Sequence, residues 1–144
     1  MTNNVAAPYR LASRLPAFAA PAAVAVVCGA ATLLVAAVDP HEAGHYPTCP
    51  SLLITGWYCP GCGSLRAVHD LAHGNVAGAM DMNPFALVAI AWLVWRWGWW
   101  LAASLGRGRS VRPAPGWLIY GLAGVVGAYW LLRNVGPFAS YLAP

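Results

Sequence analysis

Residues 16–38 contain no charged side chain, and this apolar run is the feature that most constrains the fold. About 20 apolar residues in a helix are enough to cross the roughly 30 Å hydrocarbon core of a membrane. Arginines precede the run, as in a secretory signal peptide, but the run is longer than an ordinary signal core. We therefore predict a retained membrane-spanning helix over residues 16–38.

The composition of the whole chain favours the same environment. Only 8% of its 144 residues are charged and 60% are hydrophobic, whereas a soluble domain carries about 25% charged residues. Eight tryptophans and six tyrosines suit the membrane interface, where amphipathic rings settle. We expect an all-α membrane protein in a lipid bilayer, with about three transmembrane helices.

Two further apolar segments supply the other predicted spans, at about residues 85–105 and 117–132. Tryptophans crowd around Arg96 in the first of them, which is typical of an interface belt with a snorkelling cation. Glycines spaced three apart in the second offer a face for close helix packing. The chain then divides into an N-terminal arm, residues 1–15, and one membrane domain, residues 16–144.

The arginines predict how this domain lies in the membrane. The chain has no lysine, so its net charge of +4 comes from arginine. Five arginines lie in the arm or in the turn 106–116, against two in the loop 39–84 and the C-terminal end. The positive-inside rule then predicts a multi-pass protein of the cell membrane, with a cytoplasmic N-terminus and an outward-facing loop. Because these arginines flank spans, we expect no nucleic acid partner.

The loop 39–84 combines a proline- and glycine-rich first part with two short helices. Leucine and valine recur at helical spacing after Ser64, and Gly74 is a suitable C-cap. Asn75 could cap a second helix that runs through Met82. Both helices are too short to span a membrane, so we expect them at the interface.

Three cysteines of this loop form the clearest local pattern for chemistry. Cys59 and Cys62 stand at C-x2-C spacing before a glycine, a pattern that can turn two sulfurs toward one metal ion. Zinc would need two more ligands, for which we take Cys49 and one histidine, His73. The spacing from Cys49 is not a standard zinc pattern, so a metal is one interpretation among three.

A static disulfide that staples the loop is the second interpretation. Redox exchange through Cys59 and Cys62 is the third, because the helix after Cys62 would favour its thiolate. Cys28, inside the first span, is expected to be a small buried apolar residue.

Residues 41–45, H-E-A-G-H, formally match the H-E-x-x-H motif of zinc proteases. That chemistry needs both histidines on one helical face. The segment follows Asp39-Pro40 and contains a glycine, so a helix is not expected and the protease interpretation is disfavoured.

The remaining polar residues near the bilayer are candidates for binding, because ionisable groups there are costly and often functional. An ion pair between Arg66 and Asp70 on one helix would be the simpler role for those two. We predict that Arg66, Asn83 and Arg133 contact a partner or ligand.

Several of these motifs together resemble one family, the small bacterial membrane proteins called domain of unknown function 2752. The resemblance covers about residues 33–144 and implies no activity. It is carried by Tyr46-Pro47-Thr48-Cys49-Pro50, by Cys59-Pro60-Gly61-Cys62-Gly63-Ser64-Leu65-Arg66-Ala67, by His73-Gly74-Asn75, by Asn83-Pro84 and by Arg133-Asn134.

Two functions follow as hypotheses. The first is a non-enzymatic accessory or interaction subunit, whose three cysteines hold the loop by metal or disulfide and whose partner is another membrane protein or a second copy of this chain. The second is a membrane thiol–disulfide oxidoreductase that uses Cys59 and Cys62. The sequence assigns no catalytic residue and leaves catalysis open.

Overall fold

A computed structural model describes residues 16–107 and 115–143, and every regular element in these two ranges is helical. The all-α fold class is therefore confirmed, while the arm 1–15 lies outside the described residues. The elements, in chain order, are α2 (Ala19–Ala37), α3 (Pro50–Thr55), α4 (Ser64–Ala72), α5 (Val76–Met82), α6 (Pro84–Ser104), α7 (Gly116–Asn134), the 3-10 helix η1 (Gly136–Phe138) and α8 (Ala139–Leu142).

Two of the helices, α2 and α6, are each long and apolar enough to cross a membrane, with mean hydropathies of 2.1 and 1.4. The helix α7 qualifies only together with η1 and α8, which follow it after a bend of 80°. The described part of the chain thus has two helices that could each cross a membrane, or three if this bent pair counts as one. The short helices after α7 were not predicted from the sequence.

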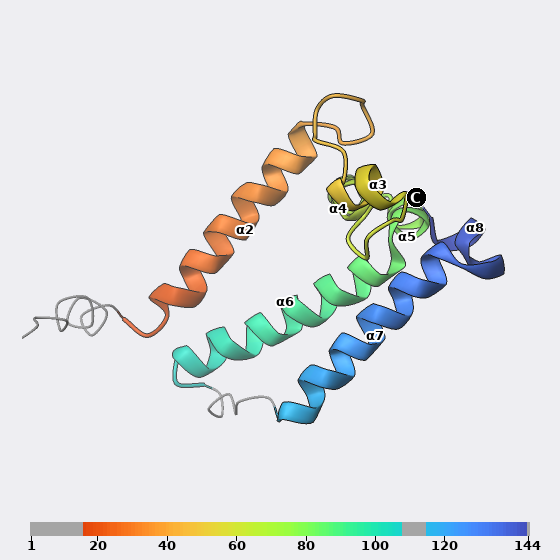
Figure 1. Ribbon diagram of the computed structural model, residues 1–144. Coiled ribbons are helices and arrows are strands. Elements are labelled where there is room, and N and C mark those ends of the chain that lie inside the picture. Colours follow the sequence, from red (N-terminus) through yellow and green to blue (C-terminus); the bar gives the residue numbers. More distant parts are fainter. Residues whose placement is uncertain (1–15, 108–114, 144) are drawn as a thin grey trace, which may run out of the picture.

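Helices α6 and α7 splay apart from the cluster of short helices, whereas α2 and α6 approach each other again at the ends far from that cluster (Figure 1). The C-terminal end of α2, the N-terminal end of α6 and the C-terminal end of α7 all lie near α3, α4 and α5. Asn83 makes the turn from α5 into α6, because its side chain accepts a bond from Ala86 N–H and Pro84 begins the new helix. The cysteine loop is therefore built at the junction of the three long helices.

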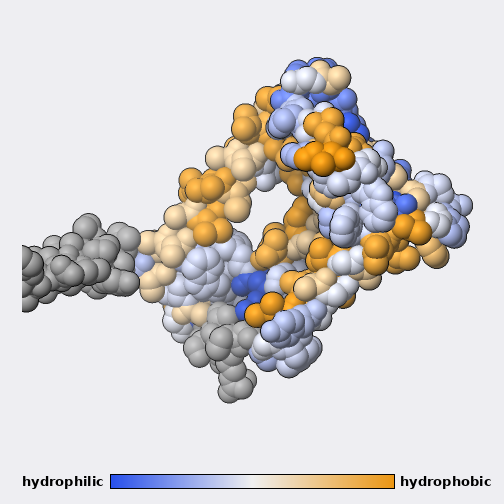
Figure 2. Space-filling model, in the orientation of Figure 1, coloured by the Kyte–Doolittle hydropathy of each residue, from blue (hydrophilic) through white to orange (hydrophobic). Residues whose placement is uncertain are grey.

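An apolar hollow opens between α2 and α6 (Figure 2). Its volume is about 730 Å³, and Trp97 crosses its edge to donate a hydrogen bond of 2.9 Å to the carbonyl of Pro21. Cys28 lines the hollow and is exposed, whereas the sequence predicted it to be buried. The difference arises because α2 packs against α4 and the end of α6 and leaves its middle uncovered.

The glycine face of α7 is not used for packing against any described residue. A Cβ atom added at Gly121, Gly124 or Gly127 would meet nothing within 4 Å. Instead α7 meets the rest of the molecule near its C-terminal end, where Tyr129 stacks on Phe85 of α6 with ring centroids 4.9 Å apart. The polar residues of that end decide how α7 is attached.

Candidate functional site

A tight turn brings the first two sulfurs of the candidate site together. The N–H of Cys62 donates to the carbonyl of Cys59 at 3.1 Å, and the N–H of Ser64 donates to the carbonyl of Gly61 at 3.0 Å. Gly63 then adopts a φ of +78°, a left-handed conformation that favours glycine, and α4 begins. We call residues 59–63 the knuckle. Its two sulfurs lie 3.2 Å apart.

The third sulfur reaches the knuckle from the start of α3. Cys49 is the N-cap residue of this helix, and its Sγ lies 3.4 Å from the Sγ of Cys59. Helix α3 was not predicted, because the prolines around it read as loop; Pro50 occupies its first turn, where proline is favourable. The helix and the turn at Gly56 lead the chain from Cys49 back to the knuckle.

The three sulfurs form a group that could hold a metal ion, because all lie within 4.8 Å of one another. Sulfurs bound to tetrahedral zinc at about 2.3 Å lie about 3.8 Å apart, close to these separations. Among the described residues, no fourth histidine, cysteine or carboxylate joins the group. The geometry therefore presents three thiolate ligands to a soft metal ion and leaves a fourth position to another ligand.

The local electrostatics make one of the three thiols more acidic than an ordinary cysteine and another one less acidic. Hydrogen bonds from the backbone N–H of Leu52 and from Cys59 lower the pKa of Cys49 to about 7. Burial, followed by its bonds to the other two cysteines, raises the pKa of Cys62 to about 12. The sequence predicted a thiolate at Cys62, at the start of α4, but desolvation raises the pKa of this thiol instead. Cys49 is therefore the more acidic thiol.

Asn83 is fully buried, and its side-chain amide hydrogen-bonds the knuckle. Its NH2 group lies 3.0 Å from each of three knuckle-side oxygens, and its Oδ1 accepts two bonds of 3.0 and 2.9 Å. Carbonyl oxygens only accept, so these partners fix the orientation of the amide. The acceptors are Pro60 O, Cys62 O and Ser64 Oγ, and the donors are Ala86 N–H and Tyr129 O–H.

Two residues at the end of α7 attach this helix to the same segment. The side chain of Asn134 accepts from the N–H of Tyr58 at 2.8 Å and donates to its carbonyl at 2.9 Å, as a neighbouring strand would. Arg133 is fully buried and donates to the carbonyls of Pro60 at 3.5 Å and Met82 at 3.3 Å. Asn83 and Arg133, expected to contact a partner, thus bind the interior of their own chain.

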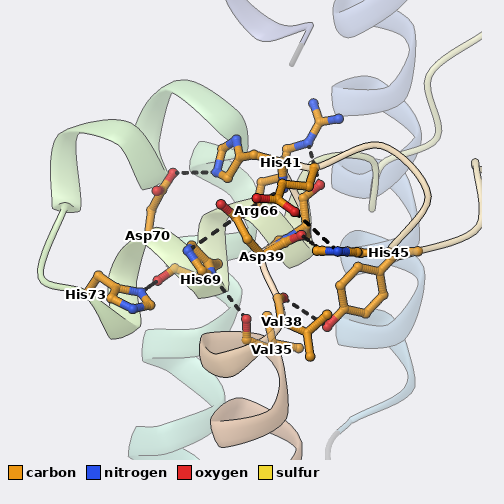
Figure 3. Close-up of polar contacts among 12 residues, drawn as sticks. Val35, Val38, Asp39, His41, His45, Arg66, His69, Asp70 and His73 are labelled. Carbon is orange, nitrogen blue, oxygen red and sulfur yellow. Dashed lines mark hydrogen bonds and ion pairs between the residues drawn. The ribbon is translucent and has the colours of Figure 1, made fainter.

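A second cluster of polar groups lies between the loop after α2 and helix α4 (Figure 3). Three histidine–carboxylate pairs make it up, with N···O distances of 3.5, 3.2 and 3.7 Å. Each of these pairs is an ion pair only when its histidine is protonated. The pairs are His41 with Asp70, His45 with Glu42, and His69 with Asp39.

The ring nitrogens of these histidines have defined roles. The Nδ1 atoms of His45 and His69 lie 2.8 and 2.9 Å from backbone carbonyls, which can only accept. Each ring therefore carries its proton on Nδ1, and a neutral ring presents a bare Nε2 to its carboxylate.

Other predicted site residues lie in this second cluster and not beside the sulfurs. His73 bonds the carbonyl of His69 at 2.9 Å, and its ring lies 4.4 Å from that of His69. Arg66 donates to the carbonyl of Pro40 at 3.3 Å, while Asp70 faces His41. The structure therefore does not bring His73 to the three cysteines, and residues 41–45 form turns and bends.

Comparison with known protein families gives a match to part of the chain. Residues 49–97 match the model of a family described as Protein of unknown function (DUF2752). The matched segment begins at Cys49 and includes the knuckle, α4, α5 and the first part of α6. No curated protein and no solved structure matches the chain.

We predict that Asn83→Ala lowers the free energy of unfolding by roughly 3–5 kcal/mol, because it leaves several buried partners without a hydrogen bond. Thermal unfolding in detergent, followed by tryptophan fluorescence, measures the effect. Asn75→Ala is the matched control, since Asn75 is an exposed N-cap with one bond to Gly78 N–H, worth about 1 kcal/mol. Equal losses in the two variants would contradict the central role of Asn83.

We predict a pH-dependent effect for Asp39→Asn. The backbone N–H of His41 lowers the pKa of Asp39 below 3.8, so the ionised carboxylate stabilises the fold above pH 3.8 and this contribution is lost as the pH falls. Thermal midpoints measured from pH 7 to pH 3 should show the variant less stable at pH 7 and the gap closing below pH 3.8. Glu42→Gln, at a largely exposed carboxylate, is the control; a pH-independent gap for Asp39→Asn would contradict this role.

Proposed function

We propose that this chain, whose residues 49–97 match the DUF2752 family of unknown function, is a non-enzymatic membrane accessory protein with a metal-stapled loop. In this proposal Cys49, Cys59 and Cys62 bind one soft metal ion, zinc being the first candidate. The ion fixes the loop 39–84 as a rigid surface at the junction of the long helices.

The convergence of three sulfurs from two segments of the loop is the observation that carries this proposal. Two of the sulfurs come from the knuckle and the third from the start of α3, so a shared ion would close the chain between residues 49 and 62. Thiolate sulfur is the ligand that zinc and other soft ions prefer. Because Cys62 is buried with a raised pKa, loading requires the ion to displace its proton and should weaken as the pH falls.

The surroundings of the loop support an accessory role. The spans α2 and α6 leave most of their apolar surface uncovered within the chain, 11% and 6% of their most hydropathic windows being buried. A bilayer covers such surface, and so does another membrane protein or a second copy of this chain. The excess of arginine on the other side of the spans favours an outward-facing loop on a cytoplasmic N-terminus.

A thiol–disulfide oxidoreductase is the second candidate, and the lowered pKa of Cys49 favours it. A thiol with a pKa of about 7 is partly ionised at neutral pH and is a competent nucleophile. In this reaction two of the cysteines, as a disulfide, would gain two electrons and two protons from a partner's two thiols, which would become a disulfide. The pair predicted from the sequence, Cys59 and Cys62, would use Cys49 as the resolving thiol.

We predict one zinc ion per chain in native mass spectra of detergent-purified protein exchanged into zinc-containing buffer. Cys49→Ser, Cys59→Ser and Cys62→Ser should each lose the ion, because two thiolates alone hold zinc weakly. Cys28→Ser is the matched control and should keep the full stoichiometry, since Cys28 lies in the hollow between α2 and α6.

The same sample separates the two candidates after denaturation and alkylation. Four alkylated cysteines support metal binding, because the ion protects the thiols in the reduced state. Wild-type protein without zinc, two hydrogens lighter and restored by mild reductant, would contradict the metal site and favour the redox candidate. Zinc retained by all three loop variants would contradict the assignment of the ligands.

A further inference from the structure

Arg133 is a buried cation whose hydrogen bonding is incomplete. No part of the residue is exposed, and its Nε has no hydrogen-bond partner within residues 16–107 and 115–143. Its two bonds to backbone carbonyls, at 3.3 and 3.5 Å, are long for N–H···O contacts. The rings of Tyr58 and Tyr129, whose centroids lie 6.0 and 5.6 Å from Cζ, add only a weak cation–π attraction.

Among the described residues, no side-chain carboxylate balances this charge. The chain has four acidic residues, all within the described part, and three of them face histidines in the second cluster. The fourth, Asp81, is exposed and forms no ion pair with Arg133. A fully buried charge without a counter-charge is strongly unfavourable, so the folded protein needs an anion near the guanidinium.

The knuckle is the group that can supply this anion. The guanidinium contacts the carbonyl of Pro60, which stands between Cys59 and Cys62, and Asn83 links that carbonyl to the carbonyl of Cys62. On the basis of the metal site proposed above, we infer that Arg133 is the counter-ion of an anionic metal–thiolate centre. Three thiolates and one divalent cation carry a net charge of −1, and Arg133 brings the total to zero.

This charge balance indicates which class of metal ion the centre binds and whether its fourth ligand is charged. A divalent soft ion such as zinc, with a neutral fourth ligand such as water, leaves the buried region neutral. Three protonated thiols, or one disulfide and one protonated thiol, carry no charge and leave Arg133 unbalanced, whereas a lone thiolate at Cys49, the most acidic of the three thiols, is the metal-free alternative that the zinc competition below separates from the proposed centre. Arg133 thus acts through the metal centre and raises its affinity for a divalent ion.

The test compares variants of the full-length protein by competition for zinc against a chromophoric chelator. Arg133→Met removes the charge and should weaken zinc binding at least 10-fold, whereas Arg133→Lys keeps the charge and should stay within about 3-fold of wild type. Arg96→Met is the matched control, because it removes a charge from the hollow beside α2 and should leave the affinity unchanged. Cobalt substitution adds a spectroscopic reading: the thiolate-to-cobalt absorption should keep its wild-type form in every variant that loads.

Each outcome decides the inference. Wild-type affinity in Arg133→Met would overturn it, and so would an equal loss in the Met and Lys variants, since that pattern reports geometry and not charge. If the Met variant does not fold, the Lys variant decides alone, and a loss above 10-fold in folded Lys variant contradicts the inference. Absence of zinc from the wild-type protein would instead contradict the proposed metal site, so the two failures are distinct.

Discussion

The buried amide of Asn83 is the interaction on which the rest of the structure depends. It caps α6, closes α5, binds the knuckle and receives the hydroxyl of Tyr129 from α7. An amide has two donors and one acceptor oxygen, so one side chain can join segments that would otherwise each leave backbone groups unpaired. In an apolar environment water does not satisfy such groups, which makes this satisfaction obligatory.

The same constraint explains why a chain with so few charged residues concentrates its polar chemistry at one end. The long helices hardly cover one another: α6 and α7 splay apart, and α2 touches α6 again only near the start of α2 (Figure 1). Their polar side chains meet where α2 and α7 end and α6 begins, through Asn83, Arg133 and Asn134 and through the pairs of His69 with Val35 and Asp39. The contacts that stabilise the fold are therefore concentrated at the loop junction. A metal ion bound there would make the packing of the long helices against the loop more rigid.

Much of the fold could be predicted because apolar runs, caps and breakers are local signals. The long helices differ from the predicted spans by only a few residues, and Asn75 caps α5 as its position suggested. It could also be predicted from the sequence that the three cysteines lie together, because two of them share a tight turn. Helix α3 was missed, since proline in a first turn looks like a loop residue until the helix is seen.

The roles of individual polar residues could not be predicted, because they depend on distant contacts. Asn83 and Arg133 were expected to face a partner, yet segments more than 20 residues away bury both. Burial also inverts the expected acidity of Cys62, and His73 contacts His69 of its own helix, away from the three cysteines.

X-ray absorption at the zinc edge of the purified, zinc-loaded protein would test the central claim most directly. The account predicts three sulfur neighbours at about 2.3 Å and one lighter atom at about 2.0–2.2 Å. A shell made only of nitrogen and oxygen would place the metal elsewhere and contradict a centre built on Cys49, Cys59 and Cys62.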